Sequence, residues 1–265
     1  DTMAVVRLSL ALLALLAVVG AANAAAVSYS QSGLDWGSGE KQSPINIVMD
    51  EAKEESAPEK FVLEYDSAAT TATVINKGST VPGSRHCARG GQVHALISYA
   101  PLCFSPLSCA QMHVHAFSEH AVNGLFSPME AHFVHVHESD PNQLAVVGVM
   151  IRLQRHDEAS AWIDTWLPKT PADVNGTATI DIPDNFWADM IDTSMGFWRY
   201  PGSLTTPDCN EIVEWHVVRK AKFLSVAQTI TFMNMLAKQN TERTDNRLPE
   251  PVNGRTVTYY TSVSS

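Results

Sequence analysis

The sequence predicts a mixed, β-dominated α/β fold: a single domain built on a large central sheet with short helices at its periphery. Short runs rich in β-branched and aromatic residues dominate the chain, and most of them end at Gly, Pro, Asn or Asp. Segments with helical periodicity are few. No linker, repeat or low-complexity tract divides the chain, so we expect one domain.

The N-terminal segment is typical of a secretory signal peptide. Met3 and Arg7 precede the apolar run LSLALLALLAVVG, and a small-residue cleavage site follows it. We therefore assign residues 1–24 to a removed signal peptide plus a short remnant ahead of Met3, and residues 25–265 to the domain. We expect a secreted, periplasmic or extracellular protein, with a lumenal compartment as an alternative. No later segment is long enough to span a membrane.

Seven runs are predicted to form strands, beginning at residues 45, 61, 70, 111, 129, 143 and 211. The run from 143, QLAVVGVMIRL, is apolar almost throughout, which predicts a strand buried on both faces in the middle of the sheet. Helices are predicted from Arg155 and after Ser225, where Ser225 and Gln228 have the spacing of a capping box. The segment 79–111 alternates too poorly for any element to be assigned.

The chain is acidic, with 18 basic and 28 acidic residues and a net charge of −10. Such a surface repels nucleic acid and anionic membranes and favours a small neutral or cationic ligand. The acidic surface is also explained if it only confers solubility, and this alternative stays open. Asn175 opens the sequon Asn-Gly-Thr, a possible glycosylation site.

Four cysteines in a chain bound for an oxidising compartment make one or two disulfides plausible. They are Cys87, Cys103, Cys109 and Cys209. No CxxC pair occurs, which argues against a zinc site made of cysteines.

Residues 111–137 contain six of the ten histidines. His113 and His115 share one face of a strand, and their spacing suits two imidazole ligands of one zinc ion. Asn123 and Gly124 form a strong hairpin-turn signal. The strand from 111 should therefore fold back antiparallel beside the strand from 129, which can supply a third ligand.

The alternation of the second strand permits two metal triads. His132 lies on one face of that strand, whereas His135 and His137 lie on the other. Glu130 shares the face of His132, and its carboxylate can accept the second ring N–H of a ligating histidine. This favours the triad that includes His132, although Glu130 also has an ordinary reading as a surface charge.

Five motifs resemble those of the α-class carbonic anhydrases, and they occur in that family's order from Tyr29 to Arg255. They are KQSPINI at 41–47, QMHVHAFSEH from 111, EAHFVH from 130, YPGSLTTPDC at 200–209 and RLPEPVNGR at 247–255. The resemblance implies a large, twisted, mostly antiparallel sheet. It also implies a zinc enzyme in which zinc-bound hydroxide attacks carbon dioxide to give bicarbonate and a proton. Sulfonamides and anions are then the expected inhibitors.

The resemblance also implies roles for individual residues. The zinc ligands would be His113, His115 and His132, with Gln111 and Glu130 as their hydrogen-bond partners. Thr205 would donate to Glu119 and accept from the hydroxide, while Thr206 and Tyr29 would lie in the active site. The apolar wall for carbon dioxide would consist of Val134, Val146, Leu204, Val213 and Trp215. His120 and His135 would be structural, and His137 packed or solvated.

The chain departs from the family pattern at the proton-shuttle position, where Ser79 stands in place of histidine. Serine does not exchange protons near neutral pH. We expect an active enzyme limited by proton export, unless His86 or His94 substitutes. Cys209 occupies a position that often forms a disulfide in secreted members, yet no cysteine precedes the QSP motif. Cys209 is therefore either free or paired with one of the other three cysteines.

The alternative to an enzyme is a catalytically silent relative that binds a partner through the same sheet. Retention of all three matching histidines, together with Glu119 and Thr205, favours the enzyme. The motif HExxH is absent, which argues against a zincin-type hydrolase.

Overall fold

The computed structural model describes most of the expected domain. The described residues are 27–37, 39–56, 62–65, 71–76, 81–87, 94–98, 107–137, 140–154, 159–183, 186, 190–239 and 244–261. The expected signal peptide, Ser79 and Cys103 lie outside them. The side chains of residues 81–87, 94–98 and 107–110 also lie outside this description, which leaves untested whether His86 or His94 replaces the shuttle.

Strands far outnumber helices among the described residues, as predicted. Their bounds are β1 Asn46–Ile47, β2 Lys53–Ser56, β3 Val62–Tyr65, β4 Thr71–Ile75, β5 Val81–Cys87, β6 His94–Ser98, β7 Leu107–His115, β8 Ala121–Val122, β9 Leu125–Phe126, β10 Met129–His137, β11 Leu144–Leu153, β12 Thr177–Asp181, β13 Phe197–Gly202, β14 Val213–Leu224 and β15 Thr258–Thr261. The α-helices are α2 Ala161–Trp166 and α4 Val226–Gln239, and the 3-10 helices are η1 Met49–Glu51 and η2 Leu167–Lys169.

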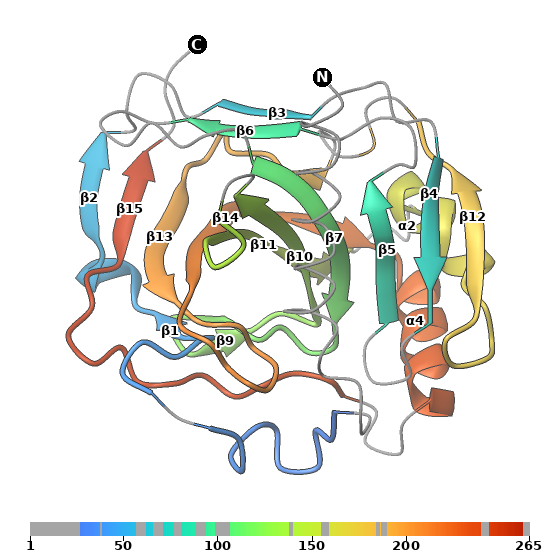
Figure 1. The fold of residues 1–265 in the computed structure, drawn as a ribbon, viewed down its shortest axis with the longest axis horizontal. Coiled ribbons are helices and arrows are strands. Elements are labelled where there is room, and N and C mark those ends of the chain that lie inside the picture. Colours follow the sequence, from blue (N-terminus) through green and yellow to red (C-terminus); the bar gives the residue numbers. More distant parts are fainter. Residues whose placement is uncertain are drawn as a thin grey trace.

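Twelve of the described strands form one large, curved sheet (Figure 1). Its main path runs β12-β4-β5-β7-β10-β11-β14-β13-β15-β2, and β6 joins β3 to β7. All strand pairs within this sheet are antiparallel except β11 with β14 and β15 with β2. A small second sheet contains β1, β8 and β9. The prediction of a large, mostly antiparallel sheet is therefore confirmed.

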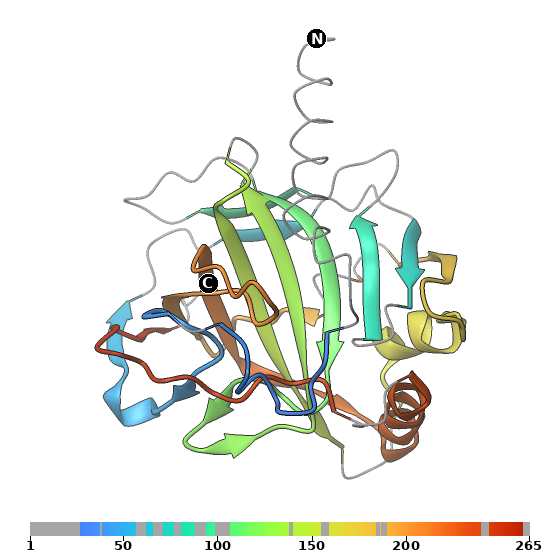
Figure 2. The same ribbon diagram turned by 60° about the horizontal axis from the view of Figure 1, so that its bottom comes forward.

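The central strands divide two apolar cores, because alternate residues of a strand point to opposite faces. On one face, Phe133 and Val147 belong to a core that helices α2 and α4 close with Trp166 and Phe232. On the other face, Val134 belongs to a separate core. Strand β11 is buried from Leu144 to Ile151, as its continuous apolar run predicts. Figure 2 shows both helices beside one flank of the sheet.

The predicted capping box opens α4. The Gln228 N–H donates to Ser225 Oγ at 3.1 Å, and the Ser225 N–H donates to Gln228 Oε1 at 3.2 Å. The other predicted helix begins later than expected, at Ala161 rather than Arg155. Ser160, which precedes it, has an extended backbone. No helix among the described residues is long and apolar enough to cross a membrane.

The predicted antiparallel pairing of the two histidine-bearing strands is confirmed, but the hairpin turn serves another pair. Strand β7 pairs with β10. Asn123 and Gly124 have positive φ angles of 49° and 75°, as a type I′ turn requires, yet they join the short strands β8 and β9. The small hairpin thus extends the connection between β7 and β10, and its strand β8 pairs with β1 instead.

Candidate metal centre

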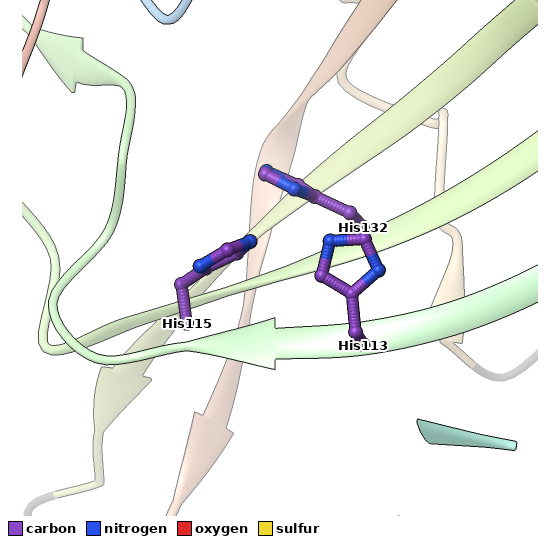
Figure 3. A group of neighbouring side chains, drawn as sticks. All are labelled: His113, His115 and His132. Carbon is purple, nitrogen blue, oxygen red and sulfur yellow. The ribbon is translucent and has the colours of Figure 1, made fainter. Parts of the chain in front are cut away.

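Three histidines converge on one face of the sheet (Figure 3). His113 and His115 project from β7, and His132 projects from β10 directly opposite His113. One possible ligand nitrogen from each ring lies within 4.8 Å of the other two. The ring centroids are 4.7 to 5.1 Å apart. The structure therefore brings together one of the two triads that the alternation permits.

The backbone of a distant segment orients His115. Its Nδ1 donates to the carbonyl oxygen of Asp245 at 2.7 Å, which fixes the tautomer. Its Nε2 is buried and has no hydrogen-bond partner among the described residues. A buried imidazole nitrogen without a partner is costly unless a ligand occupies it, so this atom is suited to a metal ion.

Glu130 orients the ring of His132. His132 Nε2 lies 3.0 Å from Glu130 Oε1, close but poorly aligned for a hydrogen bond. This contact leaves Nδ1 on the side of the triad. The other oxygen of Glu130 accepts the backbone N–H groups of Glu119 and His120, both at 2.9 Å. The carboxylate is thus fixed from several directions, as partners of metal-binding histidines commonly are.

A second group, consisting of His120, Glu130 and His132, also has its ligand atoms within 4.8 Å of one another. Its members already bond to each other and to a neighbour, however. His120 Nδ1 lies 2.8 Å from Glu130 Oε1, and His120 Nε2 bonds to the Tyr200 hydroxyl. His120 therefore completes a buried hydrogen-bond network behind the triad.

Burial lowers the pKa of two of the three imidazoles. It lowers the pKa of His113 well below its usual value, and the neighbouring His115 and His132 lower it further. Burial also lowers the pKa of His132. For His115 the burial effect is outweighed by Glu119 and Asp245, which raise its pKa. Neutral imidazoles offer the lone pairs that a metal ion needs.

Glu119 lies beside the triad, fully buried. Its Oε1 accepts the backbone N–H of Arg247 at 2.9 Å. Its Oε2 lies 3.6 Å from His115 Nε2 and 3.8 Å from His132 Nδ1, and has no hydrogen-bond partner among the described residues. Thr205, in the motif TTP, is also buried, but Glu119 Oε2 accepts no hydrogen bond from it in the described part of the chain.

The five expected wall residues gather on the face that carries His132. Val134, Val146 and Trp215 lie in one row across β10, β11 and β14. These three and Val213 are buried in the same apolar cluster, and Leu204 packs against it, partly exposed. Trp215 also packs edge-on against the rings of His120 and His132, with centroids 4.8 Å apart in each pair.

The remaining expected site residues lie at varying distances from this centre. Gln111 is opposite Val134 on β7, and its side chain makes no hydrogen bond to another described residue. Thr206 is partly exposed, and Tyr29 is buried with its ring edge-on to Trp36. Other predicted residues are placed as follows: His135 is buried and donates to Ala145 O, His137 ends β10 partly exposed, and Cys209 is a buried free thiol in the described part of the chain.

Three residues that support the centre gave no usable signal in the sequence. Asp245 and Arg247 reach it through backbone groups across more than a hundred positions of chain. Gly148 lies opposite His132 on β11, and a Cβ there would come within 2.7 Å of Glu130 Oε1. Gly148 therefore makes room for the carboxylate. Arg247 begins the C-terminal motif RLPEPVNGR, which marked the segment without revealing what it contacts.

Comparisons with known proteins point to one family. The model of the eukaryotic-type carbonic anhydrase family matches residues 29–261. A carbonic anhydrase of Dunaliella salina is 31% identical over 262 residues, which cover 88% of this chain but only 43% of that protein. Carbonic anhydrase 7 of Mus musculus is 30% identical, with 83% of this chain and 88% of that protein covered.

A solved structure has the same fold. It is the α-carbonic anhydrase of Thermovibrio ammonificans in complex with the inhibitor sulfanilamide. The TM-score is 0.67 and the sequence identity 27%, with 83% of this chain and 87% of that chain covered.

Proposed function

Because this chain belongs to the eukaryotic-type carbonic anhydrase family, we propose that it hydrates carbon dioxide reversibly to bicarbonate and a proton, using zinc held by His113, His115 and His132. The observation that carries the proposal is the convergence of three imidazoles whose ligand nitrogens lie within 4.8 Å of one another. Three neutral nitrogen ligands with an open fourth position are typical of catalytic zinc sites.

The surrounding residues prepare two of the three rings, those of His115 and His132, for the metal. When bound, zinc supplies a Lewis acid that makes hydroxide available near neutral pH, as carbonic anhydrases are known to do. The Asp245 carbonyl holds the proton of His115 on Nδ1, so that Nε2 keeps its lone pair. The Glu130 carboxylate, 3.0 Å from His132 Nε2, favours a proton on that nitrogen by its charge, so that Nδ1 keeps its lone pair. These two ligands therefore do not have to reorient when zinc binds.

Glu119 and Thr205 orient the nucleophile in this proposal. Glu119 Oε2 is buried without a hydrogen-bond partner in the described residues, so it is available to accept the hydroxyl proton of Thr205. A threonine that donates there can only accept from the nucleophile, because its single proton is used. A lone pair of the nucleophile then faces the carbon of the substrate, and ligands without a proton are disfavoured.

Carbon dioxide is small and apolar, and the row of Val134, Val146 and Trp215 supplies an apolar surface next to the polar centre. Leu204 and Val213 extend this surface, and in this proposal Thr206 would border it. The new C–O bond would form between the hydroxide oxygen and the carbon while the π electron pair of one C=O bond shifts onto its oxygen. Bicarbonate would then leave, and a water molecule that takes its place would lose the proton that the reaction releases. Sulfonamide and anion inhibition belongs to the same proposal, which the sulfanilamide complex of the relative supports.

The decisive test compares His132→Ala with His137→Ala, its control on the same strand. His132→Ala is expected to lose stoichiometric zinc and to lower CO2 hydration by more than about 100-fold, beyond what the loss of an outer partner costs. His137→Ala is expected to keep both. Zinc analysis and stopped-flow hydration measure the outcome. Full zinc and activity in His132→Ala would overturn the assignment, and zinc without hydration in the wild type would favour the silent relative.

Proton export is expected to limit the rate, because Ser79 stands at the shuttle position. CO2 hydration by the wild type should rise with imidazole-buffer concentration at fixed pH. Ser79→His should raise the rate at low buffer several-fold and weaken that dependence, and Ser79→Ala should change neither. A wild type insensitive to buffer would contradict the missing shuttle and point to His86 or His94.

We also propose that residues 25–265 form the mature domain after removal of the signal peptide, and that the protein is secreted or enters a lumenal compartment. The apolar run behind Arg7 supports this. Asn175 is exposed in a turn with φ of 64°, which suits a glycan acceptor. N-terminal sequencing of protein from the native source tests the cleavage after Ala24.

A further inference from the structure

Arg247 is a charged residue almost completely buried, with an exposed fraction of 1%. Its Nη1 donates to Gln42 Oε1 at 2.9 Å and to Ser43 O at 2.7 Å. Its Nη2 donates to Gly37 O at 3.2 Å and lies 3.1 Å from the carboxylate of Glu250. Burial of a guanidinium is costly unless such contacts compensate it, so this position is tightly determined.

The N-terminal segment, here residues 27–37 and 39–43, is packed around this side chain. Gly33 has a φ of +82°, and a Cβ at that position would come within 2.6 Å of Arg247 Cγ. The guanidinium carbon lies 5.9 Å from the ring centroid of Trp36. Leu248 adds a backbone hydrogen bond to Ser32 O at 2.9 Å. Figure 2 shows the N-terminal segment (blue) running beside the C-terminal segment (red).

The backbone around Arg247 reaches the metal centre at two points. Its own N–H donates to Glu119 Oε1 at 2.9 Å, and two residues earlier the Asp245 carbonyl accepts from His115 Nδ1. The Asp245 N–H also donates to the Ala116 carbonyl oxygen at 2.8 Å, and the Ala116 N–H donates to Asp245 Oδ1 at 2.7 Å. The position of the Arg247 amide is therefore fixed on one side by these contacts and on the other by the buried guanidinium.

We propose that Arg247 is a positioning residue for the gate formed by Glu119 and Thr205: its anchored guanidinium holds its own amide against Glu119, and the N-terminal segment thereby supports the selectivity of the fourth metal position. This inference rests on the proposed function. The Arg247 amide supplies the one hydrogen bond that Glu119 Oε1 receives among the described residues. Without that anchor the carboxylate is free to rotate, and Oε2 loses the fixed position from which the proposed function has it accept the Thr205 proton.

The experiment measures selectivity, which loss of folded protein alone does not change. The sulfanilamide anion retains an N–H that can donate to the Thr205 hydroxyl, whereas thiocyanate has no proton. Dissociation constants of both are measured on the zinc-loaded wild type and on Arg247→Met. The variant is expected to bind sulfanilamide at least about tenfold more weakly relative to thiocyanate, the effect of one hydrogen bond to a charged group.

Arg255→Met is the matched control. Arg255 lies in the same C-terminal segment and donates to three backbone carbonyls, those of Pro201, Pro251 and Val252, but not to Glu119. The Arg255→Met variant is expected to have a lower melting temperature than the wild type and the same ratio of dissociation constants. An equal change of the ratio in Arg255→Met would mean general loosening and would overturn the proposal.

Two further variants decide the outcome if Arg247→Met does not fold. Arg247→Lys keeps a charge with fewer donors and should give an intermediate ratio. Gly33→Ala displaces the arginine stem without changing its charge and should shift the ratio in the same direction. If the ratio of the two dissociation constants is unchanged in folded Arg247→Met, or in both of these variants, this inference is overturned while the proposed function still stands. A wild type that binds no zinc overturns the proposed function as well.

Discussion

At the scale of single residues, the lack of a side chain at Gly148 leaves room for a carboxylate that supports the metal centre. Glu130 is buried, and although burial raises a carboxyl pKa, His120 and His132 outweigh this and hold the pKa of Glu130 well below its usual value. The carboxylate is therefore charged and needs room beside His132. Gly148 provides that room, because every larger residue would place a Cβ against Oε1. The centre depends on this space as much as on its ligands.

Gly148→Ala is expected to displace Glu130 and so misalign His132. Zinc affinity should fall about 10- to 100-fold, the usual effect of disturbing a partner of a ligating histidine. Competition with a chelator measures it. The control is Gly37→Ala, where a Cβ meets nothing within 4 Å. Equal zinc affinity in Gly148→Ala and the wild type would show that the carboxylate can shift without consequence.

The part of the centre that lies within one pair of strands was partly predictable from alternation and spacing. A period of two and antiparallel pairing permit two triads, and the position of Glu130 together with the family resemblance favoured the one made of His113, His115 and His132. The contacts of Asp245 and Arg247 were not predictable, because they use backbone groups 128 to 130 positions from their partners. Backbone groups carry no residue-type signature. Only the resemblance of motifs drew attention to that segment.

At the scale of elements, Gln228 joins the two helices. Beyond its capping contact, its Oε1 accepts the Ser160 N–H at 2.9 Å. Its Nε2 donates to Ser160 O at 2.9 Å and to Asp164 Oδ1 at 2.7 Å. One side chain thus closes the N-terminus of α4 and fixes the start of α2, which explains why α2 begins only after Ser160.

Gln228→Ala should lower the free energy of unfolding by about 1–3 kcal/mol, because buried donors and acceptors lose their partner. The value of kcat/KM should stay unchanged, since both helices cover the face opposite the triad. Thr231→Ala, an exposed position on the same helix, serves as the control. Chemical denaturation and CO2 hydration measure the two effects, and a loss of activity without loss of stability would contradict this separation.

Strand β13 illustrates why some elements escaped prediction. Its sequence FWRYPG ends in Pro and Gly, which indicate a turn. The proline is tolerated because β15 pairs only with Phe197 to Arg199, and Pro201 lies beyond that pairing. The hairpin signal at Asn123 correctly predicted a turn, but the turn does not join the two histidine-bearing strands. It joins β8 to β9, and β8 also pairs with the distant strand β1. Local signals do not identify distant partners.

At the scale of the whole molecule, the sheet separates two environments. The catalytic face contains the triad, and the opposite face contains the helices and two further buried histidines. His135 and His216 lie opposite Ala145 and Val147, which belong to the helix-side core. Burial lowers the pKa of His135 to about 4; for His216, burial together with Arg199 and His135 lowers it to about 3.

These two histidines make stability depend on pH. The unfolded chain takes up protons near a pKa of 6.5, whereas the folded chain does so only near 4 and 3. Their contribution is therefore complete above pH 6.5 and is lost as pH falls toward 3. By pH 5 each should cost about 2 kcal/mol of unfolding free energy. Denaturation at pH 7.5 and 5 measures this.

His216→Leu should remove about half of this pH dependence while leaving His135 to titrate as before. The difference in unfolding free energy between the two pH values is compared with that of the wild type. If the variant and the wild type lose the same unfolding free energy between the two pH values, His216 is protonated equally in the folded and unfolded states.

The contacts of Arg247 also determine when during synthesis the protein can become an enzyme. Its guanidinium bonds to residues 204 to 210 positions earlier in the chain. All three histidines have left the ribosome long before Asp245 and Arg247 are made. A nascent or truncated chain can therefore collect zinc ligands on a sheet, but it lacks the backbone groups that fix His115 and Glu119. Catalytic competence thus arrives late, after both ends of the domain have met.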